Sequence, residues 1–273
     1  MIREWFKLTA LSSGSLLGVY VIFGIILDQI EQLNIRYIAS TFGRLGIITT
    51  GWIGTVIHEA SHALMCLLFG HQIVEVAWFR PIQGMKDGVL GYVQHSYNPS
   101  NLYQQVGNFF IGIAPLLLGG IIILILFKIC LPQSSRQFTE KMRYNIQSLS
   151  GSFTLIHIIQ IMGLQIMNLF ESLWNKQNIK KPSFWIFLFI AYSISTHMSL
   201  SFADLQGAAI GLGVILIGLV ILSFILALFH LPVKKCATLL IKYNAVMVSI
   251  FSIALGFSFM TLVISALLYY FLR

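Results

Sequence analysis

The chain has 273 residues, of which 57% are hydrophobic and only 10% are charged. A soluble domain of this length carries about 25% charged residues, so the composition excludes an ordinary soluble protein. It predicts an α-helical polytopic membrane protein. The net charge of +8 comes from short clusters of lysine and arginine between apolar runs, which is typical of topology signals rather than of nucleic-acid binding.

Apolar segments of about 20 residues, the length that crosses a bilayer, recur along the chain. They occupy residues 8–27, 45–69, 106–131, 208–229 and 246–272. A shorter apolar segment covers 184–200, and 146–169 carries so many polar side chains that it must face protein, a polar cavity or the interface. The pattern predicts about six or seven transmembrane helices in a single integral membrane domain, residues 1–273.

No small-residue cleavage site follows the first apolar segment, so we expect a retained span rather than a removed signal peptide. Three cysteines, Cys66, Cys130 and Cys236, cannot form a fully paired framework. Each lies in or beside an apolar segment, and buried free thiols are the expected state.

The segment 45–69 contains an H-E-x-x-H motif at His58, Glu59 and His62. On a helix the two histidines stand at positions i and i+4 and share one face. Two neutral imidazoles there can hold Zn²⁺, and the glutamate can act as general base toward water that the ion activates. Ionisable residues within a span are costly and rare, so the motif predicts a functional site. The alternative is that these three residues are buried polar groups bonded to neighbouring helices. It is unfavourable because it buries an unpaired carboxylate.

Residues 71–97 are polar and rich in β-forming residues. Two short runs, 72–79 and 89–93, flank the pair Asp87-Gly88, which predicts a β-hairpin insertion around an Asp-Gly turn. Such a hairpin could receive a substrate as an added strand, and a solvated connection is an equally open interpretation. Solvated side chains are expected for His71 and His95, which lie in this region.

Two features of the next apolar segment have structural explanations as well as functional ones. Asn108 could orient a substrate backbone, and a simple helix start explains it equally. Pro115, with Gly112, Gly119 and Gly120, predicts a kink and close packing rather than chemistry.

Zinc needs a third protein ligand and one open position. Cys66 shares a helix face with the histidines, but it stands ~12 Å from His58 along the axis, too far to bind an ion between the two histidines. Asp204 is a candidate from a later segment. The pattern Ser201-x-x-Asp204 fits a capped helix N-terminus, and a helix start can also direct a carboxylate toward a metal. His197 is a lesser candidate for a ligand or for a partner of one.

These residues resemble the site-2 protease family of intramembrane zinc metallopeptidases. That family has an H-E-x-x-H helix, then a glycine eight residues after the second histidine and a hydrophobic strand, which Gly70 and residues 72–76 match here. Its second signature, an aspartate followed closely by glycine early in a later helix, is similar to Asp204 with Gly207. The resemblance implies that Asp204 is the third zinc ligand.

The sequence thus predicts an intramembrane zinc metalloendopeptidase whose core spans 45–229, with the hairpin insertion at 71–97. One Zn²⁺ is expected on His58, His62 and Asp204, with Glu59 as catalytic base. The expected partners are the lipid bilayer and a membrane-embedded or membrane-associated protein or peptide substrate, with no nucleic acid. The low charge and small extramembrane regions predict a multi-pass protein of a prokaryotic cytoplasmic membrane. The alternative is a non-proteolytic metal-binding membrane protein, either a metal transporter or a scaffold with a degenerate site.

Overall fold

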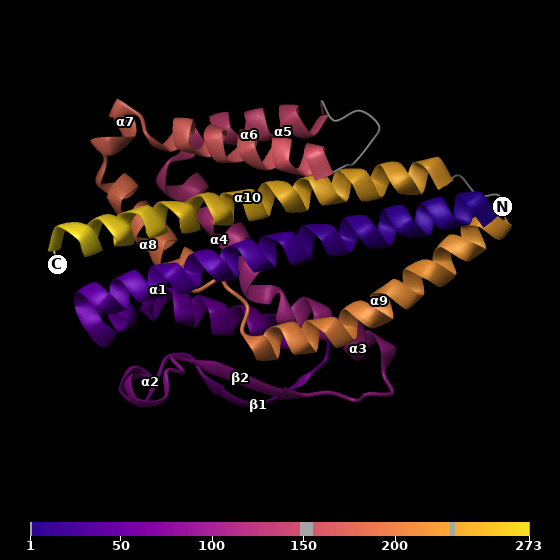
Figure 1. Ribbon diagram of the computed structural model, residues 1–273, viewed down its shortest axis with the longest axis horizontal. Helices are drawn as coiled ribbons and strands as arrows, with labels where there is room; N and C mark the ends of the chain where they lie inside the picture. Colours follow the sequence, from indigo (N-terminus) through magenta and orange to yellow (C-terminus); the bar gives the residue numbers. More distant parts are fainter. Residues whose placement is uncertain (1, 148–154, 230–232, 273) are drawn as a thin grey trace.

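The computed structural model describes residues 2–147, 155–229 and 233–272, and most of them are helical (Figure 1). The expectation of a helical protein with a small sheet is confirmed. In chain order the elements are α1 (Ile2–Leu68), β1 (Gln72–Ala77), α2 (Pro81–Asp87), β2 (Tyr92–Ser96), α3 (Leu102–Gly112), α4 (Ala114–Cys130), α5 (Pro132–Gln147), α6 (Leu155–Leu173), α7 (Lys176–Ile179), α8 (Pro182–Ser195), α9 (Phe202–Leu228) and α10 (Val233–Leu272).

The first helix, α1, consists of two legs that fold back on each other at Gly43. Gly43 has φ 64° and ψ −160°, a conformation that glycine adopts easily because it lacks a Cβ atom. Residues 2–42 run along the molecule and residues 44–68 return alongside them (Figure 1). This fold-back brings Glu31 of the first leg and Glu59 of the second leg to one cavity.

Within the described residues, two helical stretches are long and apolar enough to cross a membrane, Phe202–Leu228 and Lys242–Leu272. Helices α3 and α4, which meet at a bend of 58°, form a third candidate if they are counted as one span. This is fewer than the six or seven predicted. The predicted span 8–27 and residues 45–68 of the next one both belong to α1. Of the predicted segment 184–200, residues 184–195 belong to α8, which is too short.

The polar segment 146–169 includes residues 148–154, which lie outside the described residues. Its described remainder belongs mostly to α6, which pairs with the charged helix α5 on the far side of α10 from α1 (Figure 1).

The hydrophobic core lies where α1, α4, α8 and α10 meet. Phe187 of α8 stacks on Phe127 of α4, with ring centroids 5.4 Å apart, and meets Phe257 of α10 edge-on at 5.6 Å. Phe23 of α1 contacts Phe251 of α10 at 5.5 Å. All five rings are buried. This aromatic core holds α10 along α1 and leaves the returning leg of α1 on the side of α3, α9 and the sheet (Figure 1).

Hydrogen bonds from α10 fix the end of α8. The Ser258 hydroxyl donates to the Ser195 carbonyl at 3.2 Å, and the hydroxyls of Tyr192 and Ser265 lie 3.1 Å apart. Side-chain hydroxyl contacts of this kind join helices in apolar surroundings. The end of α8 matters because residues 196–201 lead from it directly into α9.

The sheet confirms the predicted antiparallel pair, but its connection differs from the prediction. Strand β1 pairs with β2 in a register that sets Ile73 opposite His95 and Val76 opposite Val93. The connection contains helix α2, and Gly88 (φ 81°) ends that helix in the left-handed conformation. Asp87-Gly88 is therefore a helix C-terminus rather than a two-residue hairpin turn, since left-handed glycine serves both purposes. The second strand consequently begins at Tyr92, three residues later than predicted.

Candidate metal centre

The returning leg of α1 places His58 and His62 on one helix face, as the motif predicts. Their ring centroids lie 4.8 Å apart, and their Nε2 atoms lie 3.1 Å apart. The Nε2 atoms of both rings therefore point into the same small volume.

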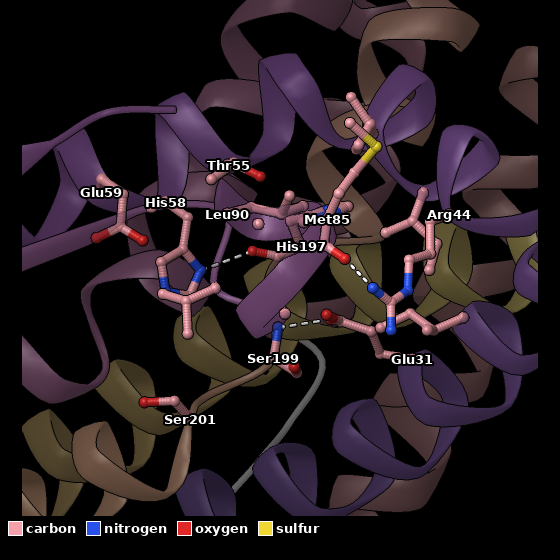
Figure 2. A pocket seen from close by; sticks show the side chains of 17 residues that line it. Glu31, Arg44, Thr55, His58, Glu59, Met85, Leu90, His197, Ser199 and Ser201 are labelled. Carbon is pink, nitrogen blue, oxygen red and sulfur yellow. Dashed lines mark hydrogen bonds between the residues drawn. The ribbon is translucent and has the colours of Figure 1, made fainter. Parts of the chain in front are cut away.

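The loop after α8 fixes the His58 ring. His58 Nδ1 lies 2.7 Å from the His197 carbonyl oxygen, to which it donates (Figure 2). The loop approaches α1 this closely because Gly51 and Gly54 have no side chains. A Cβ at Gly51 would collide with the His197 ring, and one at Gly54 with the Ser193 carbonyl. His197 thus supports a predicted ligand through its backbone, and not through its ring.

The bend between α3 and α4 fixes the His62 ring. His62 Nδ1 donates to the Ile111 carbonyl at 2.8 Å. In an unbroken helix the N–H of residue 115 would bond that carbonyl, but Pro115 has no N–H. The proline was predicted to supply a kink, with close packing at the neighbouring glycines, and the 58° bend confirms the kink. The proline also leaves the Ile111 carbonyl without its helical donor, and so available to a histidine on another helix.

Asp204 faces both histidines from the first turn of α9. Its Oδ1 lies 3.3 Å from His62 Nε2, and its Oδ2 lies 3.9 Å from His58 Nε2. The carboxylate also forms a capping box, in which the Ser201 N–H donates to Asp204 Oδ2 at 2.8 Å and the Ser201 hydroxyl accepts from the Asp204 N–H. Both explanations weighed from the sequence are therefore present together: the helix start aims the carboxylate.

Close contacts between the backbones of α3 and α9 set the position of Asp204. A Cβ at Gly112 of α3 would collide with the Asp204 carbonyl, and one at Gly211 of α9 would collide with the Phe109 N–H group. Ala208 fills the remaining space beside Gly112. The backbones approach closely at these small residues, which brings the start of α9 against the histidine pair.

The three predicted ligands fit a metal ion by the chemistry of their donor atoms. One ligand atom from each of His58, His62 and Asp204 lies within 4.8 Å of the others. Because a carbonyl oxygen can only accept, both Nδ1 atoms carry protons, and in neutral rings both Nε2 atoms are bare lone pairs. Two lone pairs 3.1 Å apart and facing a carboxylate repel one another unless a cation lies between them. Backbone carbonyls behind ligating imidazoles are also the usual support of zinc histidines.

Glu59 lies beside this centre under the chain segment that leads into β2. Its side chain is buried, and with His58 it lines both cavities at the centre, one of which is drawn in Figure 2. A Cβ at Gly91 would stand 2.8 Å from Glu59 Cγ and 2.9 Å from Thr55 Cγ2. The glycine is therefore what lets this segment cover the carboxylate.

Two cavities open onto the centre. One, of about 430 Å³, is lined by all three ligands and by Glu59, Asn108 and His95 among others. The other, of about 530 Å³, extends from His58 and Glu59 toward Glu31 (Figure 2). Glu31 accepts a hydrogen bond from the Ser199 N–H at 2.8 Å, which ties the first leg of α1 to the loop that supports His58.

Asn108 lines the first of these cavities and has an amide donor without a partner among the described residues. It is buried in the middle of α3, and the helix begins earlier, at the Asn101 cap, so a helix start does not explain it. Its Nδ2 has no hydrogen-bond partner among the described residues. A buried amide donor without a partner is costly, which favours a contact with a bound molecule.

The expectation of solvated histidines at positions 71 and 95 is wrong. His71 is buried, stacks on Tyr97 with centroids 5.1 Å apart, and donates from Nε2 to the Gln104 carbonyl at 2.8 Å. His95 is partly buried, lies 3.0 Å from His71 Nδ1 through its own Nδ1, and lines the metal cavity. Burial lowers the pKa of His95, and the neighbouring His71 lowers it further. The register of β2 against β1 brings His95 to the metal cavity, and this register cannot be deduced from the sequence alone.

The cysteine expectations are consistent with the described residues. Cys66 is fully buried and packs with Met65, Ile111 and Ala114, so it is a packing residue. Cys66 and Cys130 are free thiols, although Cys130 is only partly buried. The Cys236 side chain lies outside the described residues.

Comparison with known proteins adds no assignment: no protein-family model, curated protein or solved structure matches the chain.

Proposed function

We propose that this chain is a zinc-dependent endopeptidase that hydrolyses a peptide bond of a membrane-embedded or membrane-associated protein. The observation that carries the proposal is the pair of bare His58 and His62 Nε2 atoms facing the Asp204 carboxylate. One Zn²⁺ per chain on these three ligands leaves a coordination position for a reactant, as catalytic zinc sites do. The similarity to site-2 proteases supports the same reading.

Glu59 is the general base in this proposal. When bound, zinc supplies a Lewis acid and acidifies water to a pKa of about 7. Glu59 removes a proton from the attacking water while the water oxygen forms a bond to the scissile carbonyl carbon. The carbon–nitrogen bond then breaks, and Glu59 returns the proton to the leaving amine. The close approach of Gly91 leaves the Glu59 carboxylate buried at the wall of the cavities that would hold the substrate.

The surroundings of the centre suit an extended peptide. A transmembrane helix hides its amides in internal hydrogen bonds, so a substrate must unwind locally before hydrolysis. The Asn108 amide can donate to a carbonyl of the unwound segment, and the β1–β2 sheet beside the centre can receive it as an added strand. We propose that the span-length helices α9 and α10 and the remaining apolar helices form a multi-pass bundle in a prokaryotic cytoplasmic membrane, with the centre beside lipid.

The proposal is tested by reconstituting the protein in liposomes with a panel of single-span substrate proteins and identifying products by mass spectrometry. Glu59→Gln should lower the cleavage rate at least about a thousandfold, because it removes the base and keeps the shape. Zinc should remain bound. The matched control is Glu140→Gln, at an exposed acid on α5.

Cleavage that survives Glu59→Gln contradicts the assigned base. Zinc flux into the liposomes without cleavage of any substrate supports the transporter alternative instead.

A further inference from the structure

The imidazole of His95 is held in a single tautomer by a chain of hydrogen bonds. The Gln104 carbonyl can only accept, so His71 Nε2 carries a proton, and His71 Nδ1 is bare in the neutral ring. The 3.0 Å contact between the two Nδ1 atoms therefore requires the proton on His95 Nδ1. It follows that His95 Nε2, on the opposite side of the ring, is a bare acceptor.

This acceptor has no partner in the protein. No hydrogen bond to His95 Nε2 occurs within the part of the chain that the structure describes, and the residue lines the cavity that holds the three metal ligands. The candidate ligand group among the same residues contains His58, His62 and Asp204 without His95. His95 is thus beside the centre rather than part of its coordination sphere.

A second unpartnered group lines the same cavity. Asn108 Nδ2 is a buried donor without a partner in the described chain, so it does not use the His95 acceptor. A donor and an acceptor left open in one cavity match a molecule that carries both an acceptor and a donor. The peptide group, with its C=O and N–H, is the simplest such molecule.

The position of His95 along β2 matches an extended backbone that crosses the centre. Gly91 lies against Glu59 at the start of the segment, and His95 follows four residues later. At about 3.3 Å per residue, the two positions are about 13 Å apart along the strand, the length of roughly four extended residues. A peptide held over the metal ligands reaches both.

We propose that His95 Nε2 accepts a hydrogen bond from a backbone N–H of the peptide bound at the metal centre. The inference rests on the proposed function, and it makes His95 a substrate-binding residue of the same site. His71 acts through it, as a positioning residue that fixes the tautomer.

The test measures binding of metal-anchored inhibitors, independently of cleavage. The probe is a peptide hydroxamate, a succinyl hydroxamate with an isobutyl side chain followed by Leu-Ala-methylamide, because the hydroxamate on zinc fixes the register. Three analogues each replace one backbone N–H with an ester oxygen. Affinities are measured for the zinc-loaded wild type and for His95→Ala, His95→Gln and, as a matched control on α6, His157→Ala.

In the wild type and in His157→Ala, one analogue should bind about tenfold more weakly than the parent, the loss expected for one hydrogen bond. In His95→Ala the parent and that analogue should bind equally, with the zinc content unchanged. His95→Gln should restore part of the difference, since its amide oxygen can also accept.

An unchanged difference between parent and analogue in His95→Ala overturns the inference, and so does loss of zinc from both His95 variants. If none of the hydroxamates binds the zinc-loaded wild type, the proposed metal site is overturned together with the inference. If the predicted coupling is found in a protein that cleaves no substrate, His95 keeps its peptide-binding role and only the endopeptidase assignment fails.

Discussion

At the scale of single residues, the centre depends on backbone carbonyls that lack the helical donor four residues further along the chain. His197 and Ile111 each present a carbonyl oxygen to a histidine Nδ1 atom, and this leaves both Nε2 atoms bare. Pro115 contributes because it has no N–H to bond the Ile111 carbonyl. A residue without any chemically reactive group thereby fixes the tautomer of a ligand.

Pro115→Ala should weaken zinc binding while the protein remains folded. Alanine restores an N–H that competes for the Ile111 carbonyl and so loosens the His62 ring. Loss of such a supporting contact typically costs 10- to 100-fold in metal affinity, and we expect about tenfold. The measurement is competition with a zinc-sensitive fluorescent chelator.

Pro132→Ala, at the first residue of α5, is the matched control and should leave zinc affinity unchanged. Equal affinities for wild type and Pro115→Ala are incompatible with the role assigned to the proline.

At the scale of elements, the metal ligands come from two helices that small residues hold together. The returning leg of α1 supplies both histidines, α9 supplies Asp204, and α3 lies against both. Close approach through Gly112 and Gly211 sets the distance from the carboxylate to the histidines.

Gly211→Val should reduce the zinc content, because its side chain collides with the backbone of α3 at Phe109 and moves the start of α9. Gly213→Val is a control on the same helix, since no atom lies within 4 Å of a Cβ at that position. The measurement is zinc per chain in purified protein, with circular dichroism to confirm that helix content is kept. Equal zinc content in the two variants contradicts this account of α9.

Much of the centre could be predicted from the sequence because its parts are local. The spacing of His58 and His62 is a helical repeat, and Ser201-x-x-Asp204 is a capping pattern that lies within one turn. The environments of His71 and His95 could not be predicted, since they depend on strand register and on a distant carbonyl. The fold-back at Gly43 was missed because one glycine within a long helical pattern gives no direction of turn. The bend between α3 and α4, in contrast, was predicted, because Pro115 and Gly112 indicated a kink within the segment 106–131.

At the scale of the whole molecule, an apolar outer surface surrounds a polar centre. Side chains on the exposed side of α9, such as Ile217 and Ile221, are more than half exposed (63% and 55%). Exposed apolar side chains along a span-length helix are favourable in lipid and costly in water. The buried His62 and Glu59 and the half-buried His58 and Asp204 are costly in either setting unless a cation balances them. The account therefore depends on the ion.

Zinc per chain in the purified, full-length protein is the most direct test. Mass spectrometry of the metal should find about one Zn²⁺ per chain in the wild type and in Glu59→Gln, and less than about one tenth of that in His62→Ala and in Asp204→Ala. No bound metal in the wild type, or a full complement in Asp204→Ala, would contradict the account.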